Sequence, residues 1–175
     1  ISPMMHNASF EALGLDYRYL AFDVNEETLP TAVAGLKVLG ARGFNLTMPD
    51  KNLMVSLCDE LSTAARIIGA VNTVVNENGR LIGHNTDGIG YMQSVKDAGY
   101  DIIGKKMTLL GAGGAATAIL VQAALDGLKE ISVFVRPTSR FYDRLVHTVD
   151  ELTKITDCKI KICDFSDAEL LKQEL

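Results

Sequence analysis

The stretch Met107-Thr108-Leu109-Leu110-Gly111-Ala112-Gly113-Gly114-Ala115-Ala116 places a glycine-rich turn between a short apolar strand and a helix that continues to Gly127. The turn has the form G-x-G-x-x-A. Glycines in such a turn let backbone N–H groups approach a pyrophosphate, whose charge faces the positive end of the helix. Because strand, turn and helix follow in the required order, we predict a dinucleotide site at Gly111 through Ala115. The alternative is an ordinary glycine-rich turn.

A second apolar strand, Ile131 to Val135, should end beside the ribose of the adenosine. An acidic residue there would bind the 2′-hydroxyl of NAD, whereas arginine accommodates the 2′-phosphate of NADP. The sequence continues as Arg136-Pro137-Thr138-Ser139-Arg140, without a carboxylate. Arg136 can hold the phosphate or stack on adenine, and Ser139 and Arg140 are near enough to join it. We therefore predict NADP, with NAD as the alternative; the simpler interpretation is two solvated arginines in a loop.

A helix from Tyr142 to Thr153 and a strand from Lys159 to Cys163 extend this pattern, and residues 168–175 read as a further helix or turn. The change in composition over Asp101 to Lys106 predicts a domain boundary, with one domain at 1–100 and a dinucleotide-binding domain at 101–175. No second βαβαβ half is present, so we expect a partial chain with an incomplete Rossmann-like, doubly wound domain.

The first hundred residues alternate strands and helices, which predicts an α/β domain with a mostly parallel sheet. The expected elements are a helix from its N-cap Ser2 to Gly14, a strand at 16–23, a helix at 28–40, a strand at 44–48, a helix at 50–61, a hairpin at 70–83 that turns at Asn78-Gly79, and a helix at 89–98.

We expect the chemistry at Gly43-Phe44-Asn45-Leu46-Thr47-Met48-Pro49-Asp50-Lys51. Alternation from Phe44 to Met48 puts Asn45 and Thr47 on one face of a half-buried strand. Two short polar side chains and a lysine beyond Pro49 suit a carbonyl or hydroxyl substrate held against an amine. The simpler interpretation is an edge strand with a solvated face and a surface lysine.

Asp87 follows the hairpin within His84-Asn85-Thr86-Asp87-Gly88, at the junction between a strand and a helix. The simplest role for Thr86 or Asp87 is to cap that helix. His84 alone indicates little.

Composition limits the class of protein. The 175 residues are 47% hydrophobic, with a net charge of −5, which argues against a nucleic-acid partner. No apolar run is long enough to span a membrane, and no leader segment is recognisable. Three cysteines without accompanying histidines do not predict a metal site. We expect reduced thiols and a cytoplasmic location.

Several segments together resemble the shikimate dehydrogenase family, including its quinate/shikimate branch. The motifs lie in order along most of the chain: Ser2-Pro3-Met4-Met5-His6-Asn7, Asn45 to Lys51, Gly69-Ala70-Val71-Asn72-Thr73, Asn85 to Gly88, and Gly111 to Ala116. The resemblance implies reversible NADP-dependent reduction of 3-dehydroshikimate to shikimate, a step of chorismate and aromatic amino-acid biosynthesis.

The resemblance also assigns roles to residues. It implies a catalytic pair, Lys51 and Asp87, which would also contact the substrate. Further substrate contacts carry over to Ser2, Asn45, Thr47 and Asn72, the diphosphate loop to Gly111 through Ala115, and the NADP-type arginines to Arg136 and Arg140. Lys51 as an ammonium could donate the proton that ketone reduction needs, with Asp87 favouring its charged form.

The sequence departs from the family pattern at several points. Val135 stands where the NADP-preferring branch usually has asparagine, Pro137 follows Arg136, and Phe141-Tyr142-Asp143 is closer to the quinate/shikimate branch. A second substrate serine near the start and a tyrosine and glutamine near the end have no counterpart. The alternatives are therefore a quinate/shikimate dehydrogenase using NAD or NADP, and a non-catalytic nucleotide-binding regulatory module. A homodimer is the oligomer that we consider, although the sequence does not reveal the oligomeric state.

Overall fold

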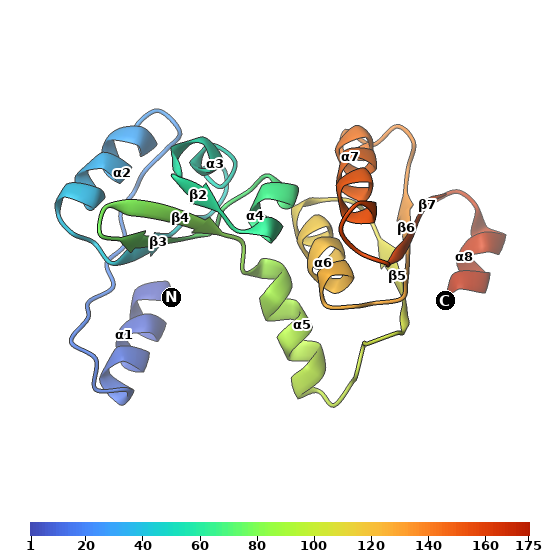
Figure 1. Ribbon diagram of the computed structural model, residues 1–175, viewed down its shortest axis with the longest axis horizontal. Coiled ribbons are helices and arrows are strands. Elements are labelled where there is room, and N and C mark those ends of the chain that lie inside the picture. Colours follow the sequence, from blue (N-terminus) through green and yellow to red (C-terminus); the bar gives the residue numbers. More distant parts are fainter.

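The computed structural model describes residues 1–175 and contains two β-sheets with helices packed around them (Figure 1). The elements in chain order are α1 (Ser2–Ala12), α2 (Leu29–Val38), β1 (Gly43–Asn45), α3 (Met54–Leu57), β2 (Glu60–Leu61), α4 (Thr63–Ile68), β3 (Thr73–Glu77), β4 (Arg80–His84), α5 (Asp87–Asp97), β5 (Lys106–Leu110), α6 (Gly114–Leu125), β6 (Glu130–Val135), α7 (Tyr142–Thr153), β7 (Lys159–Asp164) and α8 (Ala168–Glu174).

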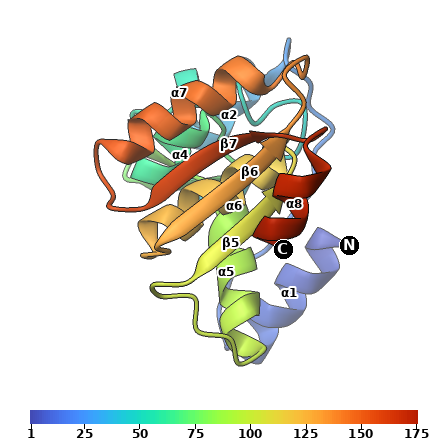
Figure 2. The same cartoon turned by 90° about the vertical axis from the view of Figure 1, so that its right-hand side faces the viewer.

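The second sheet is parallel throughout, with the order β5-β6-β7. The central strand β6 is buried from Ile131 to Val135, because α6 and α7 cover one face of the sheet and α8 lies against the other (Figures 1 and 2). Gly111 turns the chain between β5 and α6 with a φ of +101°, a conformation that glycine adopts without strain. The prediction of an α/β fold with a Rossmann-like parallel sheet is confirmed.

The first sheet is mixed, with the order β1-β3-β4-β2. β1 with β3 and β3 with β4 pair antiparallel, and only β2 with β4 is parallel. The mostly parallel sheet expected for residues 1–100 is therefore not what the structure contains. The reason is the hairpin, whose turn at Asn78 and Gly79 puts two adjacent antiparallel strands at the centre of the sheet.

Three predicted elements in this part differ from the structure. Residues 16–23 form no strand, because the backbone of Tyr19 is held by the side chain of Asn7 and has no ladder partner. The strand expected at 44–48 ends at Asn45, opposite Thr73, since the partner strand β3 begins there. The helix expected at 50–61 is reduced to α3, and Leu61 lies in β2.

Smaller differences concern helix ends and one helix that was not predicted. Ser2 is inside α1, with Ile1 at the N-cap position, so Ser2 does not cap the helix. Thr86 precedes α5 without a side-chain cap hydrogen bond. The unpredicted helix is α4, which Ser62 caps by accepting from Ala65 N.

α4 and α5 connect the two sheets by packing on α6 and α7. The larger hydrophobic cluster contains Ala64, Ile67, Ile68 and Met92 together with buried apolar residues from one face of β6 and from α6. Residues before position 101 therefore help to form the core beneath the parallel sheet. No helix combines the length and apolar composition needed to cross a membrane.

Candidate active site

Lys51 and Asp87 form an ion pair between the two elements predicted to carry the chemistry. Lys51 lies in the turn after β1, and Asp87 is the first residue of α5. Lys51 Nζ is 2.8 Å from Asp87 Oδ2, and the side chains are 18% and 42% exposed, respectively. The carboxylate therefore holds a cation at the surface, where a solute can reach both groups, instead of capping α5.

Asn72 holds the other oxygen of this carboxylate. Its Nδ2 donates to Asp87 Oδ1 at 2.8 Å, and its buried Oδ1 accepts from Thr73 Oγ1 at 3.0 Å, Thr86 N at 3.0 Å and Thr86 Oγ1 at 3.2 Å. Both oxygens of Asp87 are thus engaged, one by Lys51 and one by Asn72. The carboxylate is fixed in orientation, as a group that aligns a proton donor must be.

Asn45 extends the polar cluster along the edge of the first sheet. Its Nδ2 donates to Thr73 Oγ1 at 3.0 Å and to the backbone carbonyl of Asn72 at 3.3 Å. Its Oδ1 accepts from Tyr19 Oη at 3.2 Å. Tyr19 was not predicted as a site residue, because the aromatic segment around it was interpreted as a strand.

Ser2 and Thr47 are exposed, and their side chains make no hydrogen bond within the protein. The structure therefore joins Asn45, Asn72, Lys51 and Asp87 into one network and leaves Ser2 and Thr47 outside it. Their hydroxyls are free to bind a solute, and their substrate roles remain predictions.

Backbone hydrogen bonds explain why residues far apart in sequence meet here. Val71 N donates to Lys51 O at 2.8 Å, which ties the lysine turn to the segment before β3. Asn85 Nδ2 donates to Ala70 O at 3.1 Å, while Asn85 Oδ1 accepts from Asp87 N at 3.1 Å. Asn85 is buried and thus holds the start of α5 against the same segment.

A cavity of about 520 Å³ lies at the predicted dinucleotide site. Its lining residues are Gly111, Ala112, Gly113, Phe134, Val135, Arg136, Ser139, Phe141 and Phe165. The glycine turn, Arg136 and Ser139 are thereby brought together, and no acidic side chain faces the cavity. Gly114 and Ala115 begin α6 beside it. Arg140 is outside the lining, with its guanidinium carbon 4.7 Å from the centroid of the Phe141 ring.

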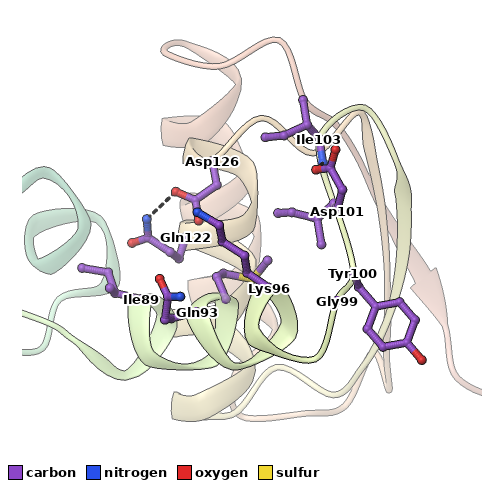
Figure 3. A pocket seen from close by; sticks show the side chains of 11 residues that line it. Ile89, Gln93, Lys96, Gly99, Tyr100, Asp101, Ile103, Gln122 and Asp126 are labelled. Carbon is purple, nitrogen blue, oxygen red and sulfur yellow. Dashed lines mark hydrogen bonds between the residues drawn. The ribbon is translucent and has the colours of Figure 1, made fainter.

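A second hollow, of about 760 Å³, lies between the end of α5, the loop after it and α6 (Figure 3). Ile89, Lys96, Tyr100 and Asp126 are among its lining residues. It contains none of the residues predicted for the site, so its size alone does not make it the place of the chemistry.

The cysteines are all free thiols. Burial raises the pKa of Cys58 to about 11, and it also raises the pKa of Cys158 and of Cys163. Thiols of this kind are poor nucleophiles near neutral pH. No group of three or more His, Cys, Asp or Glu side chains could hold a metal ion.

Comparisons with known proteins identify relatives along the whole chain. Residues 1–74 match the family model described as the shikimate dehydrogenase substrate binding domain. The chain is 53% identical over its full length to a shikimate dehydrogenase (NADP(+)) of Listeria monocytogenes serotype 4b (strain F2365), covering 60% of that relative. It is 43% identical to a quinate/shikimate dehydrogenase of Escherichia coli O139:H28, again covering 100% of this chain and 60% of the relative.

A solved structure has the same fold. The shikimate 5-dehydrogenase from Listeria monocytogenes, in complex with shikimate and NAD, aligns with a TM-score of 0.94 and 54% identity, over 99% of this chain and 60% of that one. The chain thus spans about 60% of the length of the relatives that it matches.

Proposed function

We propose that the chain is a member of the shikimate dehydrogenase family, to whose proteins it is similar over its whole length, and that it serves the reversible NADP-dependent reduction of 3-dehydroshikimate to shikimate. This step belongs to chorismate and aromatic amino-acid biosynthesis. The observation that carries the proposal is the contact of Lys51 Nζ with Asp87 Oδ2 at 2.8 Å, with Asn72 on the second carboxylate oxygen. A non-catalytic nucleotide-binding module would have no need of this arrangement.

The reduced nicotinamide would supply the hydride, and the protein has to supply the proton. Lys51 as an ammonium donates that proton to the developing alkoxide, while the carboxylate of Asp87 stabilises the charged amine and aims it. In the oxidative direction the neutral amine accepts the hydroxyl proton. The Asp87 side chain is 42% exposed, so its carboxylate can accept from a substrate hydroxyl as well.

The substrate would lie over the polar edge of the first sheet. Asn45, Thr47 and Asn72 supply amide and hydroxyl groups there, and Ser2 is the candidate contact from α1. Shikimate has three hydroxyls and a carboxylate, so several short polar side chains on one face fit its hydrogen-bonding demand. We assign these four residues to substrate binding.

The cofactor residues in this proposal are Gly111, Ala112, Gly113, Gly114 and Ala115 for the diphosphate and Arg136, Ser139 and Arg140 for the adenosine end. Arg136 and Ser139 line the cavity that contains the glycine turn, and no carboxylate is present to repel a 2′-phosphate. These observations favour NADP over NAD, because an arginine at the end of the second strand accommodates the 2′-phosphate.

Use of quinate, or of NAD, is the second candidate function. The quinate/shikimate dehydrogenase of Escherichia coli is 43% identical over the whole chain. Phe141-Tyr142-Asp143 also resembles that branch more closely. Quinate is a close analogue of shikimate, so the residues of the polar edge would serve both substrates.

The deciding experiment follows nicotinamide absorbance with shikimate and quinate, each tested against NADP⁺ and NAD⁺, using the full-length protein. Turnover of shikimate with NADP⁺ alone is the expected result. Comparable turnover of quinate or with NAD⁺ would favour the second candidate, and no turnover with any pair would exclude both. Arg136→Ala should raise the KM for NADP⁺ about tenfold or more and leave that for NAD⁺ nearly unchanged, because a charge-assisted hydrogen bond to phosphate contributes about 1.5–3 kcal/mol.

The proposal also includes a division into a substrate domain at 1–100 and a dinucleotide-binding domain at 101–175. The two separate sheets support this division. We further propose a cytoplasmic location and a homodimer, which cell fractionation and sedimentation would test.

A further inference from the structure

Arg144 crosses from the dinucleotide-binding half to the substrate half. It lies in the first turn of α7, is half-buried, and its Nη2 donates to the backbone carbonyl of Ile68, the last residue of α4. The last carbonyls of a helix have no partner within the helix, and a cation there also meets the negative end of the helix dipole. Arg144 therefore closes the end of a helix that belongs to the other half of the chain.

The turn that ends α4 lies in van der Waals range of Arg144. Gly69 follows Ile68 in the left-handed conformation, with a φ of +65°. A Cβ on Gly69 would lie 3.8 Å from Arg144 Nη2, so the guanidinium is packed directly over the turn that ends α4. The turn and the arginine form one contact.

The residues after this turn lead directly to the candidate catalytic pair. Ala70 O accepts from Asn85 Nδ2 at 3.1 Å, and Val71 N donates to Lys51 O at 2.8 Å. The next residue, Asn72, donates to Asp87 Oδ1 at 2.8 Å. Consecutive residues from Ala70 to Asn72 thus connect the end of α4 to the Lys51 turn and to Asp87.

The other end of the connection is the wall of the dinucleotide cavity. Ser139 and Phe141 line that cavity, and the chain enters α7 at the next residue. Tyr142 N donates to Ser139 O at 3.0 Å, and Leu145 N donates to Phe141 O at 2.9 Å. Arg144 therefore projects from a helical turn whose start is fixed by the cavity wall.

We propose that Arg144 is a positioning residue that couples the two ligand sites: a nucleotide in the cavity restrains the start of α7, and Arg144 passes this restraint to Asn72 and Asp87. The first ligand to bind loses affinity because it must order this connection. The second ligand meets a connection that is already ordered, so it binds more tightly. The coupling is reciprocal by thermodynamic linkage. This inference rests on the proposed function, because it takes shikimate as the ligand of the polar edge.

A nearby ion pair offers a matched control. Arg66 of α4 and Glu151 of α7 approach to 3.2 Å and join the same two helices at the surface, with Arg66 53% exposed. Arg66 is in the last turn of α4, but this pair makes no hydrogen bond to the carbonyl of Ile68. Arg66→Ala removes another arginine contact between α4 and α7, here to a carboxylate, while leaving the carbonyl of Ile68 bound to Arg144.

The test is calorimetric titration of the full-length protein with shikimate, with and without 2′-phospho-ADP-ribose. This fragment occupies a dinucleotide site but has no nicotinamide, so no turnover occurs. We expect the fragment to tighten shikimate binding in the wild type by about fivefold or more, within the usual range of coupling between sites. Arg144→Ala should reduce that ratio to about one without changing the Kd of the fragment measured alone.

Two further variants make the result decisive. Arg66→Ala should keep the wild-type ratio, and Arg144→Lys should restore part of it, because an ammonium can still donate to a carbonyl. An unchanged ratio in a folded Arg144→Ala protein, or a ratio of one in the wild type, overturns this inference alone. A wild type that binds neither shikimate nor the fragment overturns the proposed function and this inference with it.

If Arg144→Ala does not fold, the Arg144→Lys variant tests whether the coupling runs through Arg144. Its crystal structure shows whether the shorter side chain still reaches the carbonyl of Ile68. A ratio below that of the wild type supports coupling through Arg144. A full wild-type ratio in a protein whose lysine points away from that carbonyl overturns it.

Discussion

Lys51 Nζ lies 2.8 Å from Asp87 Oδ2, although 36 positions separate the two residues in the chain. Lys51 comes from the turn after β1 and Asp87 from the first turn of α5. No other cationic side chain contacts this carboxylate. The charge of Asp87 is therefore compensated by one amine. If either side chain is removed, the other faces the bound substrate as an unpaired charge.

Lys51→Ala should lower turnover by about 10²-fold or more, since a positioned acid or base typically contributes 10²–10⁴-fold. The matched control is Lys37→Ala, because Lys37 also pairs with a carboxylate, that of Asp59 at 3.4 Å, on a different part of the surface. Steady-state kinetics with shikimate and NADP⁺ checks both variants. A Lys51→Ala protein with wild-type turnover would remove the lysine from the chemistry.

The oxidation of shikimate should become faster as the pH rises. Oxidation of a hydroxyl to a ketone releases a proton, so the reaction is favoured as the pH rises, and Lys51 is the base that accepts this proton. We expect kcat in the oxidative direction to rise with pH in the wild type and this dependence to be lost in Lys51→Ala. A flat wild-type profile would argue against Lys51 as the base.

Asn72 and Thr47 should behave differently, although both are assigned to substrate binding. Asn72 is buried and orients Asp87, whereas Thr47 is exposed and has no side-chain hydrogen bond in the protein. Thr47→Val should raise the KM for shikimate a few-fold and leave kcat unchanged. The loss of one hydrogen bond weakens substrate binding by about 0.5–1.5 kcal/mol. Asn72→Ala should raise KM and also lower kcat, because Asp87 loses a donor.

Kinetics of both variants at saturating NADP⁺, together with their melting temperatures, separates these effects. Only Asn72→Ala should lower the melting temperature, since Asn72 is buried and its loss leaves the Thr86 N–H without its acceptor. A kcat effect in Thr47→Val would contradict the assignment.

The dinucleotide-binding half could be predicted closely from sequence because its signals are local. The three predicted strands agree with β5, β6 and β7 within one residue at each end, α7 matches its predicted bounds, and α6 ends at Leu125, two residues before the predicted Gly127. In a parallel sheet with buried strands, continuous apolar runs and glycine turns determine the elements without reference to partners. The sequence pattern was therefore sufficient.

The first half was predicted less well because its structure depends on partners distant in sequence. The alternation at 44–48 does not reveal that β3 begins only at Thr73, and the aromatic pattern at 16–23 does not reveal that Asn7 binds the backbone of Tyr19. Likewise, no local pattern predicts that Lys51 meets Asp87. That pairing followed from the family resemblance, and the contact to Tyr19 was missed.

Gly88→Ala should destabilise the protein, and Gly90→Ala should not. A Cβ on Gly88 would collide with the carbonyl oxygen of Ala118 and lie 2.7 Å from Gln122 Cβ, so α5 and α6 would have to separate. Overpacking of this kind costs typically about 1–3 kcal/mol. Gly90 lies on the same helix with nothing within 4 Å of its Cβ position, and alanine there should stabilise by up to about 1 kcal/mol.

Chemical denaturation of the two variants measures the difference in the free energy of unfolding. Gly88→Ala should also lower kcat/KM, because Asp87 precedes Gly88 and moves with it relative to the start of α6. Equal stability of the two variants would show that the contact between α5 and α6 adapts without strain.

Glu174 should make the attachment of α8 sensitive to acid. The ammonium of Lys106, with a further hydrogen bond from Ser132, holds the pKa of Glu174 below its usual value of 4.5. A carboxyl whose pKa is lower in the folded state contributes stability above its unfolded pKa and loses it as the pH falls through the folded pKa. The melting temperature of the wild type should therefore exceed that of Glu174→Gln at pH 7, and the difference should shrink as the pH is lowered from about 5 to 3.

Glu169→Gln is the matched control, since Glu169 pairs only with exposed Lys172 on the same helix. A difference between wild type and Glu174→Gln that stays constant over this pH range would mean that the charge of Glu174 does not hold α8 on the sheet.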